Sequence, residues 1–458
     1  MHNNISEYRP EIDGLRAFSV LFVILYHLNI PLFGGGFLGV DIFFVISGYL
    51  ISKLIFFEIK NKKFSLYNFY ERRFRRILPN LYFVILINIA VALIIFTPDK
   101  LISFSQSIIG NLFFVPNIVF WKQGGYFDLV NTAKPLFHTW SLGVEEQFYL
   151  IFPIFTILII RFGFSLMSKV ITFSFFLSLI FMIYYNELKP IFSFYMLPTR
   201  GWEIILGIII SLYEQSRLKK IDNNNVKNLL CIIGVLLIIL SIIFINEKFI
   251  FPGLILLVPM TGVLLFILYC DKTTFIYKIF SNKILVFFGL ISYSLYLWHH
   301  PIIVYSYELE IKRNYLFYIL FFIFLILLST FSWHFVEKNF RNFKRINTKY
   351  FYSILILSFI FLLTFANVIK SKRGNFKGLS DFQLEFFDTN SNDIYVWKNF
   401  KNNKINKENL KEAEILIIGD SFAADLFNIL VENKKMKERK IKSFEIPVTC
   451  KNFDIDLR

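Results

Sequence analysis

Cysteine is almost missing from this chain of 458 residues. The three that occur, Cys231, Cys270 and Cys450, are far apart and never form a Cys-x-x-Cys pair. This scarcity argues against a disulfide framework and a zinc site, so no metal is expected. A cleavable signal pattern is also lacking, because the first residues, MHNNISEYRPEIDG, are polar and mixed in charge. We therefore expect the first hydrophobic segment to stay in place as a helix.

Acidic residues are in short supply: 33 Asp and Glu stand against 49 Lys and Arg, which gives a net charge of +16. A basic chain can bind nucleic acid, but this one has no basic groove motif with stacking aromatic residues, so nucleic-acid binding is not expected. Its cations lie between long apolar runs, where they are typical of membrane-flanking segments that set topology.

Hydrophobic residues, by contrast, make up 56% of the chain, and 59 of them are Phe. Such a composition indicates that lipid rather than water surrounds most of the protein. We predict an all-α polytopic membrane protein with about 11 transmembrane helices, each needing about 20 mostly apolar residues. The segments are approximately 13–30, 37–58, 78–97, 142–160, 170–186, 199–214, 229–245, 251–270, 284–305, 315–336 and 350–369. The stretch 101–121 is interrupted by polar residues and Pro, and is expected to be re-entrant or to lie at the surface.

The distribution of cations predicts the orientation. With the N-terminus in the cytoplasm, the inside segments hold 23 Lys and Arg and the outside loops hold 7. This asymmetry follows the positive-inside rule. An odd number of spans then places the polar tail after residue 370 outside the cytoplasm. No internal repeat of the kind found in inverted-repeat transporters is apparent.

The first span contains three ionisable residues, Asp13, Arg16 and His27. Such groups are costly inside a hydrophobic span and are usually functional. Arg16 and His27 are separated by roughly 16 Å along a helix axis and return to nearly the same face. The pair suits a long substrate that is held by its anionic end inside and reacts at its far end. Two interface residues with snorkelling side chains explain the pattern equally well.

The second span, in GGGFLGVDIFFVISGYLIS, carries Asp41, and its glycines allow helices to approach closely. The sequence ERRFRRILP follows, with a cluster of four arginines: Arg72, Arg73, Arg75 and Arg76. Cations at a cytoplasmic membrane edge are ordinary topology anchors. Arginine also binds phosphate through paired hydrogen bonds, and a nucleotide-type cofactor arriving from the cytoplasm would need such a cluster.

Later spans carry further polar groups. The fourth begins with HTWSLGVEEQFYL, where His138 and Glu145 are seven residues apart and would share a helix face. At least one carboxylate here is expected to face a polar interior. In the sixth, Arg200 and Glu203 can pair as i,i+3 neighbours. Histidines also stand at the ends of later spans, where interface residues are common: His299, His300 and His334.

Several long motifs stand in a fixed order over about residues 8–340: YRPEIDGLRAFSVLFVILYH, GGGFLGVDIFFVISGYLIS, RRFRRILP, HTWSLGVEEQFYL, RGWE, SYSLYLWHHP and HFVEKNFR. Together they resemble the acyltransferase-3 family of membrane O-acyltransferases. The Arg16-x10-His27 spacing is similar to the signature pair of that family.

The resemblance implies an enzyme of the bacterial cytoplasmic membrane. It would move an acyl group, commonly acetyl from cytoplasmic acetyl-CoA, onto a sugar hydroxyl of an envelope glycan such as lipopolysaccharide O-antigen or peptidoglycan. By the same analogy His27 is the catalytic base, with Asp13 among the catalytic residues. Arg16 and the Arg72–Arg76 cluster would hold the acyl-CoA, and His138 and Glu145 would line the acceptor side.

Two other functions are compatible with a polytopic membrane protein. A transporter or flippase of an envelope precursor would need polar intramembrane residues without chemistry, but the motif order favours the enzyme. A structural scaffold would leave the buried Arg, His and Glu residues unexplained.

The polar tail, residues 371–458, follows a linker and eleventh helix at 341–370. Its sequence EILIIGDSFAADLFNIL predicts a strand, a turn with Ser421 and a helix, and resembles the start of an SGNH-type domain. Phe422 stands where that motif commonly has His, and no His occurs after His334, so the triad of such hydrolases is incomplete. We expect a short partial α/β tail that is a fragment, truncated or degenerate, in which Ser421 performs no hydrolysis.

Overall fold

The computed structural model describes residues 8–126, 133–215, 221–247 and 249–378, and four short stretches of the tail, 415–419, 426–427, 430–431 and 441–445. Contacts divide the chain into two compact units. The first, which we call the helical unit, comprises Met1–Phe96 and Ser103–Lys370. The second, the tail unit, comprises Thr97–Ile102 and Ser371–Arg458.

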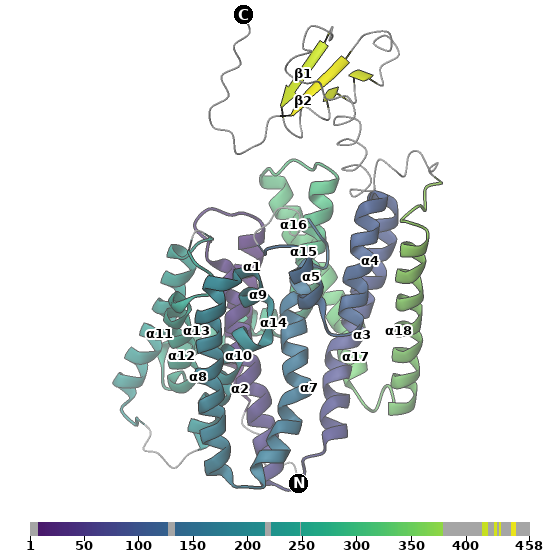
Figure 1. Cartoon of the computed structure of the whole chain (residues 1–458). Helices are drawn as coiled ribbons and strands as arrows, with labels where there is room; N and C mark the ends of the chain where they lie inside the picture. The colour runs from purple at the N-terminus through teal and green to yellow at the C-terminus, as the bar shows by residue number, and fades with distance from the viewer. Residues whose placement is uncertain are drawn as a thin grey trace, which may run out of the picture. The chain divides into compact units, whose positions relative to one another are not determined.

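Helices account for most of the described chain (Figure 1). The α-helices are α1 (Pro10–His27), α2 (Gly39–Lys60), α3 (Leu66–Ile95), α4 (Pro98–Leu112), α5 (Pro116–Gln123), α7 (Trp140–Ile160), α8 (Phe164–Leu188), α9 (Pro190–Tyr195), α10 (Leu197–Gln215), α11 (Asn224–Phe244), α12 (Leu257–Tyr269), α13 (Phe275–Phe280), α14 (Lys283–Leu290), α15 (Ser292–Glu308), α16 (Tyr315–Phe331), α17 (Lys338–Arg341) and α18 (Thr348–Ser371). Short 3₁₀ or π-helical turns precede or extend several of them: η1 (Gly36–Leu38), η2 (Phe137–Thr139), η3 (Leu254–Leu256) and η4 (Ser332–Glu337).

Long apolar helices follow the predicted spans. Within the described residues, eight helical segments are long and apolar enough to cross a membrane: those containing α2, α3, α7, α8, α10, α11, α16 and α18. The other three predicted spans are also helical. However, these three do not reach the length and apolar character of the other eight. Helix α1 carries three charged residues, α12 is short, and the ninth predicted span is divided into the separate helices α14 and α15. The multi-pass helical architecture is confirmed, and the count of eleven spans stays a prediction.

The segment 101–121, predicted to be re-entrant or surface-lying, forms most of α4 and α5. These helices have 15 and 8 residues, fewer than the approximately 20 needed to cross a bilayer. Pro116 begins α5, where its missing amide hydrogen costs no helical hydrogen bond. The polar interruptions in the sequence therefore divide this segment into two short helices.

Two glycines fix α2 between its neighbours. A Cβ atom on Gly39 would lie 2.4 Å from the backbone oxygen of Ser19 in α1. One on Gly48 would lie 1.9 Å from the backbone oxygen of Ile204 in α10. Real Cβ atoms do not approach a backbone so closely, so only glycine permits this packing. The close approach predicted from the glycines is confirmed, and it holds α2 and its polar residues at a fixed distance from α1 and α10.

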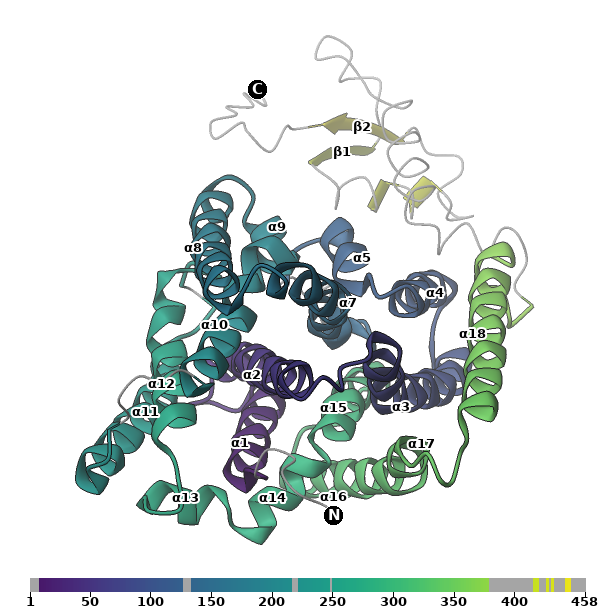
Figure 2. The ribbon, with the colours of Figure 1, turned by 90° about the horizontal axis from the view of Figure 1, so that it is seen from below.

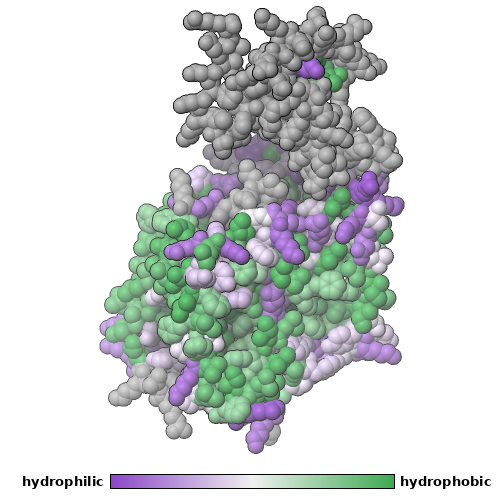
Figure 3. All heavy atoms as spheres, viewed as in Figure 1, coloured by the Kyte–Doolittle hydropathy of each residue, from purple (hydrophilic) through white to green (hydrophobic). Residues whose placement is uncertain are grey.

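Hydrophobic side chains cover much of the visible face of the helical unit (Figure 3). Helices α16 and α18 lie at the edge of the unit (Figure 2) and expose large apolar residues, among them Leu320, Leu327, Leu357 and Phe361. A soluble monomer rarely exposes such a surface, whereas lipid tails solvate it without cost. The outer helices therefore face lipid.

The described part of the tail unit contains two parallel strands, β1 (Ile415–Gly419) and β2 (Ile441–Glu445), with Ile415 paired to Ile441. The predicted strand is β1, and β2 was not predicted individually. Ile417, Phe427 and Ile441 form a small buried cluster. Parallel strands need a crossover between them, and residues 426–427 and 430–431 of that crossover are helical. Ser421 and Phe422 lie outside the described residues.

Candidate active site

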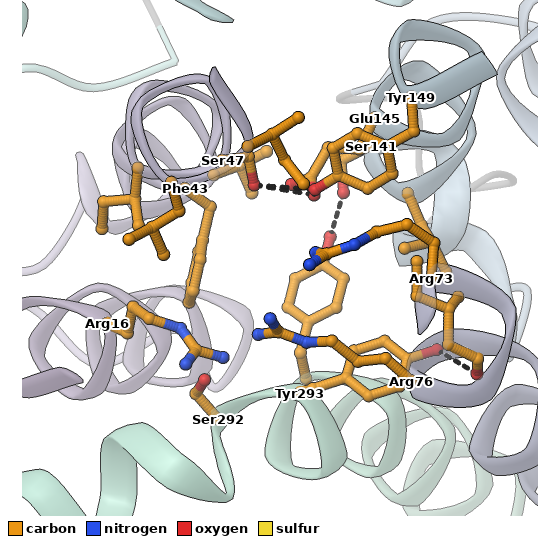
Figure 4. A pocket seen from close by; sticks show the side chains of 17 residues that line it. Arg16, Phe43, Ser47, Arg73, Arg76, Ser141, Glu145, Tyr149, Ser292 and Tyr293 are labelled. Atoms are coloured by element: carbon orange, nitrogen blue, oxygen red, sulfur yellow. Dashed lines mark hydrogen bonds between the residues drawn. The ribbon is translucent and has the colours of Figure 1, made fainter. Parts of the chain in front are cut away.

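Three arginine side chains converge on a pocket inside the helical unit (Figure 4). Arg16 comes from α1, and Arg73 and Arg76 come from α3. We call this the arginine pocket. Its remaining polar lining comes from α2, α7 and α15: Ser47, Ser141, Glu145, Tyr149, Ser292, Tyr293 and Tyr296. Among the described residues, neither Arg73 nor Arg76 has an ion-pair partner, so their guanidinium groups are available to an anion such as phosphate.

The four arginines predicted to bind the cofactor divide into two pairs. Arg73 and Arg76 are three residues apart and share the face of α3 that lines the pocket. Arg72 and Arg75 share an adjacent face and are used within the protein. Arg75 is 1% exposed and pairs with Glu71 at 2.9 Å, while it donates to two backbone carbonyls. Arg72 pairs with Glu58 at 2.8 Å.

Asp13 orients Arg16. Its carboxylate accepts a hydrogen bond from Arg16 Nη1 at 3.0 Å and another from the hydroxyl of Tyr8 at 2.7 Å. Asp13 does not line the arginine pocket. It therefore lies beside the cation at the beginning of α1, at the opposite end of that helix from His27.

Glu145 lies in the arginine pocket. It accepts hydrogen bonds from Ser47 Oγ at 2.9 Å and from the Tyr149 hydroxyl at 2.7 Å (Figure 4). It thus faces a polar interior, as expected for at least one carboxylate of this span. Glu145 was predicted to lie with His138, but in the structure it lies with the arginines. The reason is that His138 precedes α7, in the turn η2, and does not continue the helix face of Glu145.

Four histidines gather at the far end of α1. We call them the histidine cluster: His27, His138, His299 and His300. The ring of His27 lies 5.1 Å from that of His299 and 5.2 Å from that of His300. The ring of His138 lies 5.3 Å from each of the same two rings. Among the described residues, no group of His, Cys, Asp or Glu has the geometry of a metal site, and this cluster is no exception.

Tyr296 and Ser141 connect the two regions. Both line the arginine pocket, and their hydroxyls are 2.6 Å apart. The Tyr296 hydroxyl also donates to the backbone oxygen of His138 at 2.7 Å, and the backbone oxygen of Tyr296 contacts His299 Nδ1 at 2.7 Å. The arginine pocket and the histidine cluster are therefore adjacent parts of one polar region.

His138 is 1% exposed, and within the described residues neither of its ring nitrogens makes a well-aligned hydrogen bond, although the ring lies near the backbone oxygen of Pro135. Buried polar groups in native proteins are nearly always paired, and an unmade bond at such a place needs an explanation. A ligand that enters the cluster can supply the missing partner.

Comparison with known proteins identifies the family of the chain that holds this site. A family model described as an acyltransferase domain matches residues 9–336, well over half of the chain. The chain belongs to the acyltransferase-3 family. No solved structure matches it.

Relatives of this acyltransferase-3 chain include proteins with named activities. It is 36% identical over 309 residues to the peptidoglycan O-acetyltransferase OatA of Listeria monocytogenes, a match that covers 65% of the chain and 50% of that protein. It is 35% identical over 310 residues to the O-acetyltransferase OatA of Staphylococcus aureus, covering 65% and 51%. The chain therefore spans about half the length of the curated relatives it matches.

Two members of the histidine cluster of this acyltransferase-3 chain, His299 and His300, were not predicted from the sequence to belong to the site. His299 and His300 are 0% and 2% exposed, so neither is an interface residue. The available signal was their adjacency in SYSLYLWHHP. Two neighbouring histidines on a helix point about 100° apart, so at least one of them must face away from lipid. His334 lies in η4, outside the cluster.

A second buried charge group supports the acyltransferase-3 fold. Arg200 bonds to Asp41 and to Glu203, whose carboxylate oxygen is 3.1 Å from Arg200 Nε, and all three are at most 1% exposed. The predicted i,i+3 pair of Arg200 and Glu203 is confirmed, and Asp41 joins the two as the third member of a buried charge group. Four aromatic rings surround the guanidinium at 5.3–5.7 Å: those of Phe44, Trp140, Phe194 and Phe251. Because Asp41 and Arg200 lie on different helices, this group joins α2 to α10.

Proposed function

We propose that the protein transfers an acetyl group from acetyl-CoA to a hydroxyl of an envelope glycan. The observation that carries this proposal is that the arginine pocket and the histidine cluster are adjacent, with Tyr296 and Ser141 between them. Arg16, Arg73 and Arg76 provide three cations for the phosphates of the donor, and His27 provides a base at the other end of α1. Membership of the acyltransferase-3 family supports the same chemistry.

In the proposed reaction, His27 takes the proton of the acceptor hydroxyl as its oxygen attacks the thioester carbonyl carbon. The carbon–sulfur bond then breaks, and His27 returns the proton to the departing thiolate of coenzyme A. We assign His138 to the thioester oxygen, because a ring N–H of this buried imidazole, which makes no well-aligned hydrogen bond among the described residues, can stabilise the negative charge that develops there. Glu145 and Asp13 stay at the donor end, where they orient neighbouring polar groups.

For the acceptor we favour peptidoglycan over lipopolysaccharide O-antigen. The support is the printed activity of the Listeria relative, which is 36% identical over the matched region. We further propose that β1 and β2 belong to the start of an SGNH-type domain, supported by their parallel pairing around a helical crossover.

The function can be tested with purified protein in vesicles. With radiolabelled acetyl-CoA on the cytoplasmic side, we expect alkali-labile label to appear on peptidoglycan fragments outside. Label on O-antigen alone would contradict the acceptor assignment. Movement of an envelope precursor across the bilayer without consumption of acetyl-CoA would support the transporter instead.

The proposed topology has the N-terminus in the cytoplasm and the tail after residue 370 outside, supported by the 23-to-7 distribution of cations. An alkaline phosphatase reporter joined at residue 380 is therefore expected to be active. A fluorescent protein that folds only in the cytoplasm, joined at the same place, should stay dark. A cytoplasmic signal at residue 380 would contradict an odd number of spans.

Arg76 lines the arginine pocket, whereas Arg72 of the same motif pairs with Glu58, so substitutions of these two residues should affect donor binding differently. Arg76→Ala should raise the KM for acetyl-CoA by about 10- to 100-fold, because a hydrogen bond to a charged group contributes about 1.5–3 kcal/mol. Arg72→Ala is the matched control, since it removes only a partly exposed pair with Glu58 worth about 0–1 kcal/mol. Steady-state kinetics over a range of acetyl-CoA concentrations measures both. Equal KM changes in the two variants would show that the pocket does not bind the donor.

A further inference from the structure

A chain of hydrogen bonds holds His27 and begins at a backbone carbonyl. His299 Nδ1 lies 2.7 Å from the backbone oxygen of Tyr296, one turn earlier in α15. His299 Nε2 lies 3.2 Å from His27 Nδ1. On the other side of the His27 ring, Nε2 lies 3.3 Å from the hydroxyl of Tyr126. These contacts form one line from the Tyr296 carbonyl through His299 and His27 to Tyr126. The backbone oxygens of Val23 and Leu295 also lie near the rings of His27 and His299, and the Val23 oxygen favours a proton on the same His27 nitrogen that contacts His299.

The first partner decides the direction of every bond that follows. A carbonyl oxygen only accepts, so the hydrogen of a neutral His299 must be on Nδ1. Its Nε2 then carries a lone pair and must accept from His27 Nδ1–H. A neutral imidazole has one N–H, so Nε2 of His27 also carries a lone pair. That lone pair accepts the Tyr126 hydroxyl in the absence of substrate.

We propose that His299 is a positioning residue that fixes the Nδ1–H form of His27 and so leaves Nε2 as the base. The inference rests on the proposed function, in which His27 takes the proton of the acceptor hydroxyl. The acceptor hydroxyl would replace Tyr126 at Nε2. Protonation of Nε2 makes His27 a cation, and its Nδ1–H bond to His299 becomes charge-assisted and stronger. His299 changes no covalent bond and keeps its own proton throughout.

His300 makes it possible to distinguish the positioning role of His299 from a contribution to packing alone. Its ring is 5.2 Å from that of His27, almost the same distance as the ring of His299. Its Nδ1 faces the backbone oxygen of Pro135 at 3.3 Å, and within the described residues it makes no hydrogen bond to His27. His300→Phe therefore removes a neighbouring imidazole without breaking the line of bonds, and is the matched control.

The kinetic experiment compares three variants in vesicles. His299→Phe keeps a flat ring but removes the acceptor, and should lower kcat on the order of 10²-fold while the KM for acetyl-CoA stays within about twofold. His299→Gln carries an amide oxygen that can accept from His27 Nδ1–H, and should recover most of this loss. His300→Phe should lose less than about tenfold. Wild-type kcat in His299→Phe, or a loss equal to that of His300→Phe without recovery by Gln, would overturn the proposal.

A second measurement does not depend on turnover. Nitrogen-15 NMR of histidine-labelled protein in bilayers distinguishes the two neutral forms of the ring, and the His27 signal is assigned from its loss in His27→Gln. We expect a proton on Nδ1 in the wild type and a shift toward Nε2–H in His299→Phe. A wild-type protein that transfers acetyl groups with the proton of His27 on Nε2 refutes the positioning role alone. A wild-type protein that has the expected form but transfers nothing refutes the proposed function alone.

Discussion

His27→Ala is expected to lower acetyl transfer by about 10²–10⁴-fold, the usual effect of removing a general base. The imidazole of His27 is the member of the histidine cluster that stands on α1, the helix that also carries Arg16 into the arginine pocket. The measurement is the rate of ester formation on peptidoglycan fragments at saturating acetyl-CoA. Because His27 ends its helix, the substitution should not prevent membrane insertion.

Binding of the donor provides the control for this result. Acetyl-CoA should bind His27→Ala with nearly wild-type affinity, whereas Arg16→Ala should bind it poorly. Arg16→Lys keeps the charge but loses the planar fork, so it should weaken binding less than Arg16→Ala does. His334→Ala, outside the cluster, should transfer at the wild-type rate. Normal transfer by His27→Ala at normal protein levels would refute the proposed mechanism.

Arg200→Met is expected to destabilise the helical unit by about 3–5 kcal/mol, because it leaves Asp41 and Glu203 buried without a cation. Thermal unfolding in detergent can be followed with a thiol-reactive dye, since Cys231 and Cys270 are buried in the folded protein. A Cys450→Ser background confines the signal to these two thiols.

A triple variant, in which Arg200 and both of its carboxylate partners are neutral, is the matched control. Adding Asp41→Asn and Glu203→Gln to Arg200→Met should restore much of the lost stability, since no unpaired carboxylate then remains. If Arg200→Met unfolds at the wild-type temperature, the buried group does not stabilise the contact of α2 with α10. A triple variant that is as unstable as the single one would assign the loss to missing packing instead.

The membrane helices could be predicted because their information is local. Runs of apolar residues define them, and the glycines of the second span predicted its close packing. Arg16 and His27 could be placed on nearly the same face of one helix, roughly 16 Å apart, by counting residues. The short helices α4 and α5 could not be separated, because a few polar residues and one Pro decide where each ends.

Which residues meet at the site could not be predicted in the same way, because it depends on contacts between segments that are far apart in the sequence. Nothing in SYSLYLWHHP reveals that His299 meets His27, a residue 272 positions earlier. Glu145 could not be assigned to the arginine pocket until the turn η2 was known to separate it from His138. The division of the four arginines was accessible from their i,i+3 spacing, but which face meets the pocket depends on how α3 packs.

The uninterrupted helix α1 determines how far apart the phosphates and the thioester of the donor must be. Between Arg16 and His27 the helix contains no Gly or Pro, so their separation of roughly 16 Å is fixed by backbone geometry. The backbone of neither residue can move toward the other without unwinding the helix. Discrimination among donors would then depend on the reach between their phosphates and their thioester. A thioester on a shorter arm would occupy the arginines and still fall short of the base, acting as an inhibitor instead of a substrate.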